Sequence, residues 1–286
     1  RRVGGTCVIR GCVLKKLMVY ASHYGEDFED AEGYGWSGPR PTFDWARFIA
    51  NKDKEIDRLN AAYKSTLAKA GAVLIESRAE LIDRNTISVG GKQVTAQVIL
   101  IATGSWPEMP KVPGIEHAIS SNECFHLKQL PGRVVVVGGG YIALEFAGIF
   151  NGLGSKTTVL YRGEQVLRGF DHDVRNFLQD ELVKKGITVR CRTEVTRIDK
   201  AAGGLTVTLN DGTAIDCDRI LYATGRRPLT RNMGLEKVGV ALDEAGAVKV
   251  NAGSQSGVPN IYAIGDCTNR INLTPVAIRE GHAFAD

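Results

Sequence analysis

The sequence has 286 residues, of which 43% are hydrophobic and 24% are charged, and its formal net charge is +4. This composition is typical of a globular protein with two domains or one large one. The charges are interspersed, which argues against binding to nucleic acid or to a membrane surface. No apolar run approaches the roughly 20 residues of a membrane span, and no signal peptide is visible. Six cysteines in a chain this long do not indicate a secreted disulfide scaffold, so we expect a cytoplasmic protein.

Residues 4–16 hold Cys7 and Cys12 between a glycine pair and a lysine pair. In a regular helix the Cα atoms of positions i and i+5 lie roughly 8 Å apart, whereas a disulfide needs about 4.4–6.8 Å. A bridge between the two cysteines would therefore need a distorted backbone, which Gly11 permits. The lysines would favour a thiolate at Cys12. We predict a redox-active pair, with two inert thiols or a metal half-site as less favoured alternatives, because the other four cysteines stand singly.

The next segments suggest a helix, a loop and a group of short strands. Residues 17–22 can continue a helix, and a loop rich in glycine and proline follows from residue 25. Apolar residues recur at helical spacing through residues 43–70, which predicts a long amphipathic helix ending at Gly71. Strands are predicted at residues 72–75, 86–89, 93–94 and 97–101, and the last of these leads into Ala-Thr-Gly at residues 102–104.

A second series of elements starts at about residue 115. Strands are predicted at residues 133–137, 157–161, 187–191, 205–209, 214–215 and 219–222, with helices up to residue 153 and over residues 172–185. Residues 223–225 repeat the Ala-Thr-Gly ending, and residues 260–266 form a further short strand ending on Gly-Asp before a helix at residues 274–285. This repeated plan predicts an α/β protein with two doubly wound, Rossmann-like nucleotide-binding units.

A glycine fingerprint follows the four valines of the strand at residues 133–137. Gly138 permits the tight turn, and Gly140 lets a pyrophosphate approach the helix N-terminus. Ala143 allows close packing of helix on strand. The position of the motif between a strand and a helix favours dinucleotide binding over a merely structural turn.

The end of the following strand carries arginines instead of an acidic residue. Arg162 and Arg168 suit the 2′-phosphate of NADPH through charge-assisted hydrogen bonds, whereas an NAD enzyme would place a carboxylate here. The alternative is a pair of surface arginines without a role.

The cysteine segment resembles the redox-active motif of the flavoprotein disulfide reductases, and most of all that of the glutathione reductases. Their version has Asn-Val between the cysteines and Pro before the lysines, where this chain has Ile9, Arg10 and Leu14. The resemblance implies an FAD-binding domain over residues 1–114 and 250–286, with an NADPH-binding domain over residues 115–249 inserted in it. It further implies a homodimer in which electrons pass from NADPH to FAD, to a Cys7–Cys12 disulfide with a thiolate at Cys12, and to glutathione disulfide.

The resemblance also assigns roles to single residues. Lys15 and Glu145 would pair beside the flavin, Tyr141 would cover the nicotinamide pocket, and Tyr63 would gate the disulfide substrate or pack in the core. The cofactor-binding residues that the motifs or the resemblance imply are Gly5, Thr6, Thr103, Gly104, Gly138, Gly140, Tyr141, Ala143, Arg162, Arg168, Gly225, Arg226, Asp266, Leu273 and Thr274. Cys267 is expected to be a buried thiol. Gly163 and His282 stand where some members have a His and a substrate-binding Arg.

The five histidines are scattered, and none forms a general-acid pair with a carboxylate at a telling spacing. In the family this pair comes from a C-terminal dimerisation domain of the partner subunit. The chain therefore resembles an internal portion of the family's length, lacking also the first FAD-domain strand, and we expect weak flavin binding and incomplete turnover. Reductases of the trypanothione, thioredoxin, mercuric or dihydrolipoamide type remain alternatives, as does an NADPH-binding module without disulfide turnover.

Overall fold

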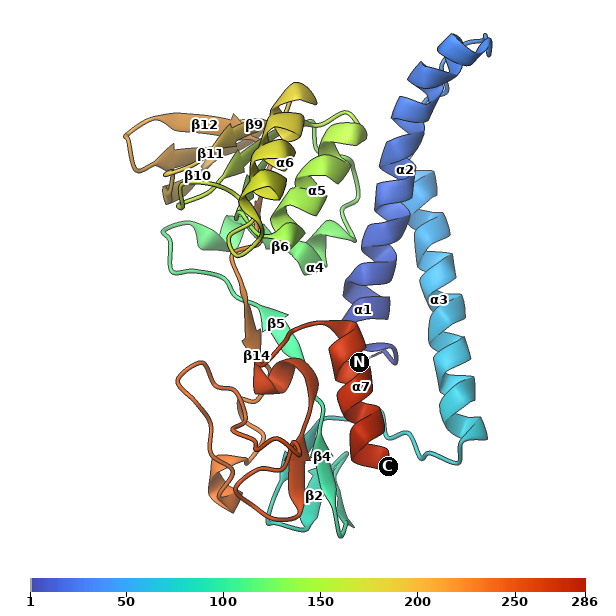
Figure 1. Cartoon of the computed structure of the whole chain (residues 1–286), viewed down its shortest axis with the longest axis vertical. Helices are drawn as coiled ribbons and strands as arrows, with labels where there is room; N and C mark the ends of the chain where they lie inside the picture. The colour runs from blue at the N-terminus through green and yellow to red at the C-terminus, as the bar shows by residue number, and fades with distance from the viewer. Residues whose placement is uncertain (1) are drawn as a thin grey trace. The chain divides into compact units, whose positions relative to one another are not determined.

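The computed structural model describes residues 2–286. Backbone contacts divide the chain into two compact units, which we describe separately (Figure 1). Unit 1 comprises residues 1–6, 60–106 and 225–286, and unit 2 comprises residues 7–59 and 107–224. Unit 1 is thus built from segments on both sides of residues 107–224, as expected for an insertion. The predicted domains over residues 1–114, 115–249 and 250–286 are functional divisions, and their boundaries stay a prediction.

Unit 2 is built on a five-stranded parallel sheet with the order β6-β13-β7-β8-β9. Its strands are β6 (Ile119–Ser120), β7 (Arg133–Val137), β8 (Lys156–Leu160), β9 (Thr188–Arg190) and β13 (Arg219–Tyr222). From β7 the chain moves outward through β8 to β9 and then crosses back to β13 on the other side of β7. This change of direction beside the first long strand is characteristic of doubly wound nucleotide-binding sheets. The α/β fold class predicted from the sequence is therefore confirmed.

The valines of β7 explain how the sheet is covered on both faces. Val134 and Val136 belong to one core cluster, whereas Val135 and Val137 belong to another. Successive side chains of a strand point to opposite faces, so a run of four valines requires two apolar layers. One layer includes α5 (Tyr141–Gly152) and α6 (His172–Lys184), and the other includes the antiparallel sheet of β10 (Val195–Ala201), β11 (Gly204–Leu209) and β12 (Ala214–Cys217).

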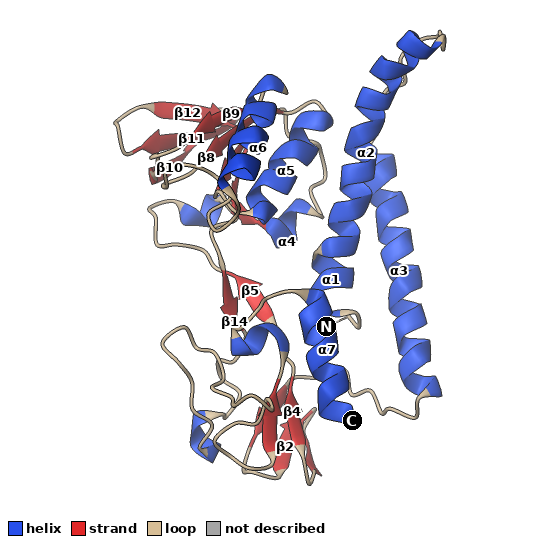
Figure 2. Cartoon of the chain, viewed as in Figure 1, coloured by secondary structure: helices blue, strands red, loops and turns tan. Residues whose placement is uncertain are grey.

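Two long helices complete unit 2 (Figure 2). The short α1 (Gly5–Arg10) leads into α2 (Cys12–Ala31), and α3 (Trp45–Lys69) starts in unit 2. Trp45 Nε1 donates a hydrogen bond to the Leu127 carbonyl at 2.8 Å, and Leu14 and Met18 of α2 share a core cluster with α5. The smaller elements are the 3-10 helices η1 (Glu32–Tyr34) and η2 (Ile115–His117) and the one-turn helix α4 (Ser121–Cys124).

Unit 1 contains small sheets and the C-terminal helix. Strands β1 (Ala79–Leu81), β2 (Thr86–Val89) and β3 (Lys92–Thr95) form an antiparallel sheet. Strand β4 (Ile99–Ile101) pairs in parallel with β15 (Ile261–Ala263), which brings residues about 160 positions apart into register. Strand β5 (Ser105–Pro107) pairs with β14 (Arg226–Pro228). The 3-10 helices η3 (Glu236–Val238) and η4 (Gly265–Thr268) and helix α7 (Thr274–Ala285) complete the unit.

The structure departs from the predicted secondary structure in several places. Helix α2 continues to Ala31 through the segment expected to be a loop, and Gly25 lies inside it. Residues 72–75 form no strand, and Val73 is 87% exposed, so an apolar run without a pairing strand stays irregular. Strand β10 was missed because only Val195 and Ile198 are buried, three positions apart across an irregularity in the pairing, so its sequence shows no alternation. The short strands β1, β5, β6 and β14 were also not predicted.

Gly114 and Gly212 allow a matched test of packing in unit 2, because their φ angles are +83° and +80°. A Cβ atom at Gly114 would lie 1.8 Å from the Ile198 carbonyl oxygen, whereas one at Gly212 would meet nothing within 4 Å. We expect Gly212→Ala to lower the free energy of unfolding by about 1 kcal/mol through backbone strain alone. Gly114→Ala should lower it by about 3 kcal/mol or more. Urea denaturation measures both, and equal losses would contradict the packing described here.

Asp218 ties the start of β7 to the turn before β13. Its carboxylate accepts hydrogen bonds from the Arg133 backbone amide at 2.8 Å and from the Arg133 side chain at 2.7 and 3.1 Å. Burial acts to raise the pKa of Asp218, but the bonds from Arg133 outweigh it and lower that pKa below its ordinary value of 3.8. A carboxyl with a lowered pKa in the folded state stabilises the protein above the ordinary value, and the contribution disappears as the pH falls through the folded-state pKa.

Asp218→Asn should therefore lower the free energy of unfolding by about 1–2 kcal/mol at pH 7. The difference from wild type should shrink as the pH falls below 4. Asp180→Asn, on the exposed face of α6, serves as the control. It should change neither the free energy of unfolding at pH 7 nor the dependence of that free energy on pH. A constant difference between pH 7 and pH 2.5 would show that the ionised carboxylate is not responsible.

Candidate functional site

The two cysteines lie on either side of a break between helices of unit 2. Cys7 is half-buried in α1, and Cys12 is exposed as the first residue of α2. The helical run is interrupted at Gly11, the residue predicted to allow a distorted backbone. The Gly11 carbonyl accepts the first hydrogen bond of α2, from the Lys15 amide at 2.9 Å. Leu14, which takes the place of a proline at this helix start, is 1% exposed and anchors the segment in the core.

Lys15 carries the most specific contact of this segment. Its Nζ donates to Glu145 Oε1 at 2.7 Å, joining residues 130 positions apart on α2 and α5. The two side chains are 23% and 38% exposed, so the pair lies at the edge of the core. The predicted contact between Lys15 and Glu145 is present, and its role beside a flavin stays a prediction. The ion pair fixes one turn of α2 and therefore the direction in which its N-terminal Cys12 faces.

The other four cysteines lie in different surroundings. Burial raises the pKa of the Cys124, Cys217 and Cys267 thiols, to about 11 for Cys217, and raises that of half-buried Cys191. Cys267 Sγ donates to the Ile264 carbonyl at 3.1 Å, as expected for a buried thiol. These four thiols are held protonated and so are poor nucleophiles.

The glycine fingerprint forms an open turn between β7 and α5. Gly138 has φ +142°, and a Cβ atom there would lie 2.5 Å from the Ala223 carbonyl oxygen, so the turn requires glycine. Ala143 is fully buried against the strand, as predicted. At Gly140, by contrast, a Cβ atom would meet nothing within 4 Å, and no side chain caps the N-terminus of α5. The backbone amides at a helix N-terminus and the open space beside Gly140 fit a pyrophosphate.

Tyr161 closes the glycine turn from the end of β8. A Cβ atom at Gly139 or at Gly163 would lie 2.6 Å from its ring, so both positions must be glycine as long as the ring stays there. This contact explains why Gly163 stands where some family members have His. Arg162 and Arg168 follow Tyr161 in the sequence, and both are exposed. In the described part of the chain neither guanidinium is paired with a carboxylate, which fits an anionic ligand. Tyr141, the first residue of α5, is 46% exposed.

In unit 1 the Ala-Thr-Gly segment after β4 meets Asp266 through Ser105. Ser105 Oγ donates to Asp266 Oδ2 at 2.6 Å and accepts from Arg226 Nε at 2.8 Å. The hydrogen-bonded series Arg226–Ser105–Asp266 thus links the turns after the two Ala-Thr-Gly segments with the Gly-Asp turn after β15. Ser105 was not predicted as a site residue, because nothing in the sequence reveals that its side chain is buried.

Thr103 carries a buried hydroxyl, Oγ1, that lacks a hydrogen-bond partner among residues 2–286. Buried hydroxyls are normally satisfied, so an additional polar group fits here. Gly104 has φ +70°, with nothing within 4 Å of an added Cβ atom. This pattern fits a cofactor that approaches the backbone after β4.

The remaining predicted residues lie at the ends of elements. Gly5 and Thr6 start α1, Gly225 precedes β14, and Leu273 and Thr274 start α7. Tyr63 on α3 is 46% exposed and therefore does not pack in the core. His282 is exposed on α7. Their roles stay predictions.

Residues 2–286 contain no cluster of three His, Cys, Asp or Glu side chains arranged to hold a metal ion. Over the same residues no helix is both long and apolar enough to cross a membrane.

Comparisons with known proteins support this description. Glutathione reductase of Burkholderia cepacia is 51% identical over 285 residues, covering 100% of this chain and 64% of the relative. The chloroplastic/mitochondrial glutathione reductase of Pisum sativum is 48% identical, covering 99% and 52%. Trypanothione reductase of Trypanosoma congolense is 41% identical, covering 99% and 61%. The chain thus spans about half to two-thirds of the length of these relatives.

Solved structures show the same fold. The HOCl-induced flavoprotein disulfide reductase RclA from Escherichia coli superimposes with a TM-score of 0.88 at 28% identity, covering 98% of this chain and 61% of that protein. The profile of the pyridine nucleotide-disulphide oxidoreductase family matches residues 2–281. The chain belongs to the pyridine nucleotide-disulphide oxidoreductase family.

Proposed function

We propose that this chain is the cofactor-binding and redox core of an NADPH-dependent flavoprotein disulfide reductase that acts on glutathione disulfide. The observation that carries the proposal is the Lys15–Glu145 ion pair at 2.7 Å, which holds the helix beginning at Cys12 against the helix beginning at the glycine fingerprint. A cysteine pair and a dinucleotide fingerprint can each occur alone. Their connection through one ion pair supports a shared reaction.

The residues present fit FAD and NADPH. Thr103, Gly104 and Asp266 would hold FAD, with Thr274 at the start of α7. Gly138, Gly140 and the arginines Arg162 and Arg168 would hold NADPH. When bound, the two cofactors supply a hydride and a two-electron relay to the cysteine disulfide.

The chain's own residues account for the thiol chemistry. Two electrons and two protons convert a Cys7–Cys12 disulfide into two thiols. The Cys7 thiolate then attacks glutathione disulfide, forming a mixed disulfide and releasing one glutathione thiolate. Cys12 attacks the Cys7 sulfur, restoring the disulfide and releasing the second glutathione. Lys15 favours the thiolate form of Cys12 through its charge, and Glu145 keeps that charge in place.

Glutathione disulfide is the preferred substrate class because relatives named glutathione reductase are 48–51% identical, against 41% and 44% for the trypanothione reductases of Trypanosoma congolense and Leishmania donovani. The exposure of Tyr63 supports contact with that substrate. We further propose a homodimer and a cytoplasmic location for the whole protein. The partner subunit would then supply the general acid that protonates the leaving thiolate.

Replacing both arginines after β8 tests the choice of coenzyme. Arg162→Gln with Arg168→Gln should weaken NADPH binding about 10- to 100-fold, because each guanidinium would lose a charge-assisted hydrogen bond to the 2′-phosphate. NADH binding should change less than about threefold, since NADH lacks that phosphate. Fluorescence titration measures both affinities. Arg197→Gln, which alters an exposed ion pair with Asp199 on β10, is the matched control. An equal loss for both coenzymes would refute the assignment.

Alkylation of the cysteines tests the proposed electron acceptor. The chain loaded with FAD is treated anaerobically with iodoacetamide, with and without NADPH, and the labelled peptides are identified by mass spectrometry. Cys7 and Cys12 should be labelled only after NADPH, whereas Cys124 and Cys267 should stay unlabelled because both are fully buried. Cys191→Ser is the control and should leave the pattern unchanged. Labelling of Cys7 and Cys12 that does not depend on NADPH would rule out the proposal.

A further inference from the structure

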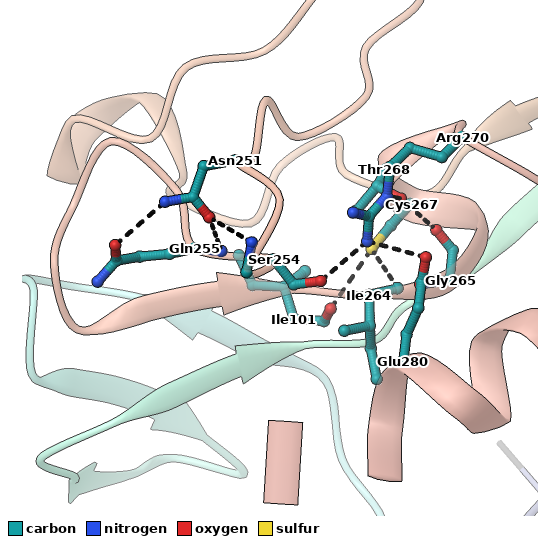
Figure 3. Close-up of polar contacts among 11 residues, drawn as sticks. Ile101, Asn251, Ser254, Gln255, Ile264, Gly265, Cys267, Thr268, Arg270 and Glu280 are labelled. Carbon is teal, nitrogen blue, oxygen red and sulfur yellow. Dashed lines mark hydrogen bonds and ion pairs between the residues drawn. The ribbon is translucent and has the colours of Figure 1, made fainter. Parts of the chain in front are cut away.

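A partly buried carboxylate on α7, that of Glu280, holds the backbone of the turn that carries Asp266. Glu280 Oε2 accepts a hydrogen bond from the Gly265 amide at 2.6 Å, and Glu280 Oε1 pairs with Arg270 Nη2 at 2.9 Å (Figure 3). The Glu280 side chain is only 18% exposed. Each of its two oxygens therefore has a positively polarised partner, which is the arrangement a largely buried carboxylate requires.

Arg270 extends the network in two further directions. Its Nη2 also donates to Ser254 Oγ at 2.9 Å, and its Nε donates to Thr268 Oγ1 at 3.2 Å (Figure 3). Thr268 Oγ1 in turn donates to the Gly265 carbonyl at 2.8 Å. The amide and the carbonyl of Gly265 are thus both held by side chains that Arg270 contacts directly.

Ser254 is itself rigidly placed. It is 8% exposed, its φ angle is +61°, and its carbonyl accepts from the Ala263 amide of β15 at 2.9 Å. Asn251 orders the same loop, since its Oδ1 accepts from the Gln255 amide at 3.0 Å (Figure 3). The Arg270 guanidinium is therefore anchored to the sheet as well as to η4.

Gly265 lies in a conformation that glycine adopts readily and other residues do not. Its φ angle is +68°, and a Cβ atom there would lie 3.1 Å from Ala277 Cβ of α7. The turn directs the next residue, Asp266, toward Ser105. Asp266 Oδ2 accepts a hydrogen bond from Ser105 Oγ at 2.6 Å. A shift of the Gly265 peptide would displace the Asp266 carboxylate and the start of η4 together.

We propose that Glu280 and Arg270 are positioning residues for the flavin site, acting through Gly265 and Asp266. The inference rests on the proposed function, because it takes the ligand of Asp266 to be the polyhydroxyl chain of FAD. Glu280 holds the Gly265 amide, and Arg270 holds Glu280 in the orientation that does so. Neither side chain contacts the cofactor in this account. Sequence patterns did not single out either residue, because their spacing of ten along the chain brings them together only through η4 and α7.

The test compares cofactor affinities in variants of the whole chain. Glu280→Gln keeps an oxygen that can accept from Gly265 but loses the ion pair, and Glu280→Ala loses both. We expect FAD binding to weaken about 10-fold in Glu280→Gln and more in Glu280→Ala, since charge-assisted hydrogen bonds are lost. Arg270→Gln should match Glu280→Gln, and the double variant should be no weaker than either, because the two residues act as one unit. NADPH affinity should stay within about twofold, since its proposed site lies in unit 2.

A second measurement does not need the cofactor. Amide hydrogen exchange in the FAD-free chain should become faster at residues 265–268 in each variant. Glu80→Gln, which alters an exposed ion pair with Lys237 in the same unit, is the matched control for both measurements. It should change neither FAD affinity nor exchange at η4.

The outcomes separate the two proposals. A wild-type chain that binds no FAD would overturn the proposed cofactor site and the positioning role with it, before any variant is compared. A wild-type chain that binds FAD, with unchanged affinity and exchange in the Glu280 and Arg270 variants, would overturn the positioning role alone. Equal losses of FAD and NADPH affinity would indicate general destabilisation and would likewise overturn it.

Discussion

The close packing of α2 against α5 is the constraint on which the organisation of unit 2 depends. A Cβ atom at Gly152 would lie 3.0 Å from Ser22 Cβ and 3.1 Å from the Ser22 carbonyl oxygen, so the helices approach as closely as glycine allows. The Lys15–Glu145 ion pair fixes the other end of the contact. Two points fixed along a helix determine both its direction and its rotation. The orientation of Cys12 relative to the glycine fingerprint follows from this contact.

The same contact explains why the redox segment tolerates an unusual sequence. Leu14 and Met18 are buried in the core that includes Phe146 and Phe150 of α5. Burial of two large apolar side chains contributes several kcal/mol, roughly 1.5–3 kcal/mol each, far more than the helix-start preference of a proline. Packing, rather than local backbone stiffness, therefore holds the start of α2 in this chain.

Much of unit 2 could be predicted from the sequence because its signals are local. The four valines of β7, the glycines at residues 138–140 and the helical spacing of α6 each determine their own structure over a few residues. Strand β10 could not be predicted because an irregularity between Val195 and Arg197 removes the alternation of buried and exposed residues. The length of α2 could not be predicted because Gly25 weakens the local helix signal, whereas α2 packs along α5, a helix distant in the chain.

The residues of the candidate site likewise divide into those that the sequence predicts and those that it does not. Cys7, Cys12, Gly138 and Arg162 stand in recognisable motifs, and the Lys15–Glu145 pairing was expected from the family resemblance. Ser105 and Glu280 had no such motif, since each acquires its significance from a contact made in three dimensions: Ser105 with Asp266, and Glu280 with Gly265. The Ser105 side chain is buried and the Glu280 side chain is partly buried. Spacing along a sequence does not reveal such burial.

The central claim is that electrons from NADPH reach a disulfide substrate through this chain. The most direct measurement follows the visible absorbance of the FAD-loaded chain under anaerobic conditions, first with one equivalent of NADPH and then with glutathione disulfide. The account predicts bleaching by NADPH and a slow recovery on addition of glutathione disulfide, with two thiols released per disulfide consumed. The recovery is slow because the general acid that protonates the leaving thiolate would come from outside this chain. Bleaching without recovery would contradict the substrate assignment, and a flavin that NADPH does not bleach would contradict the account as a whole.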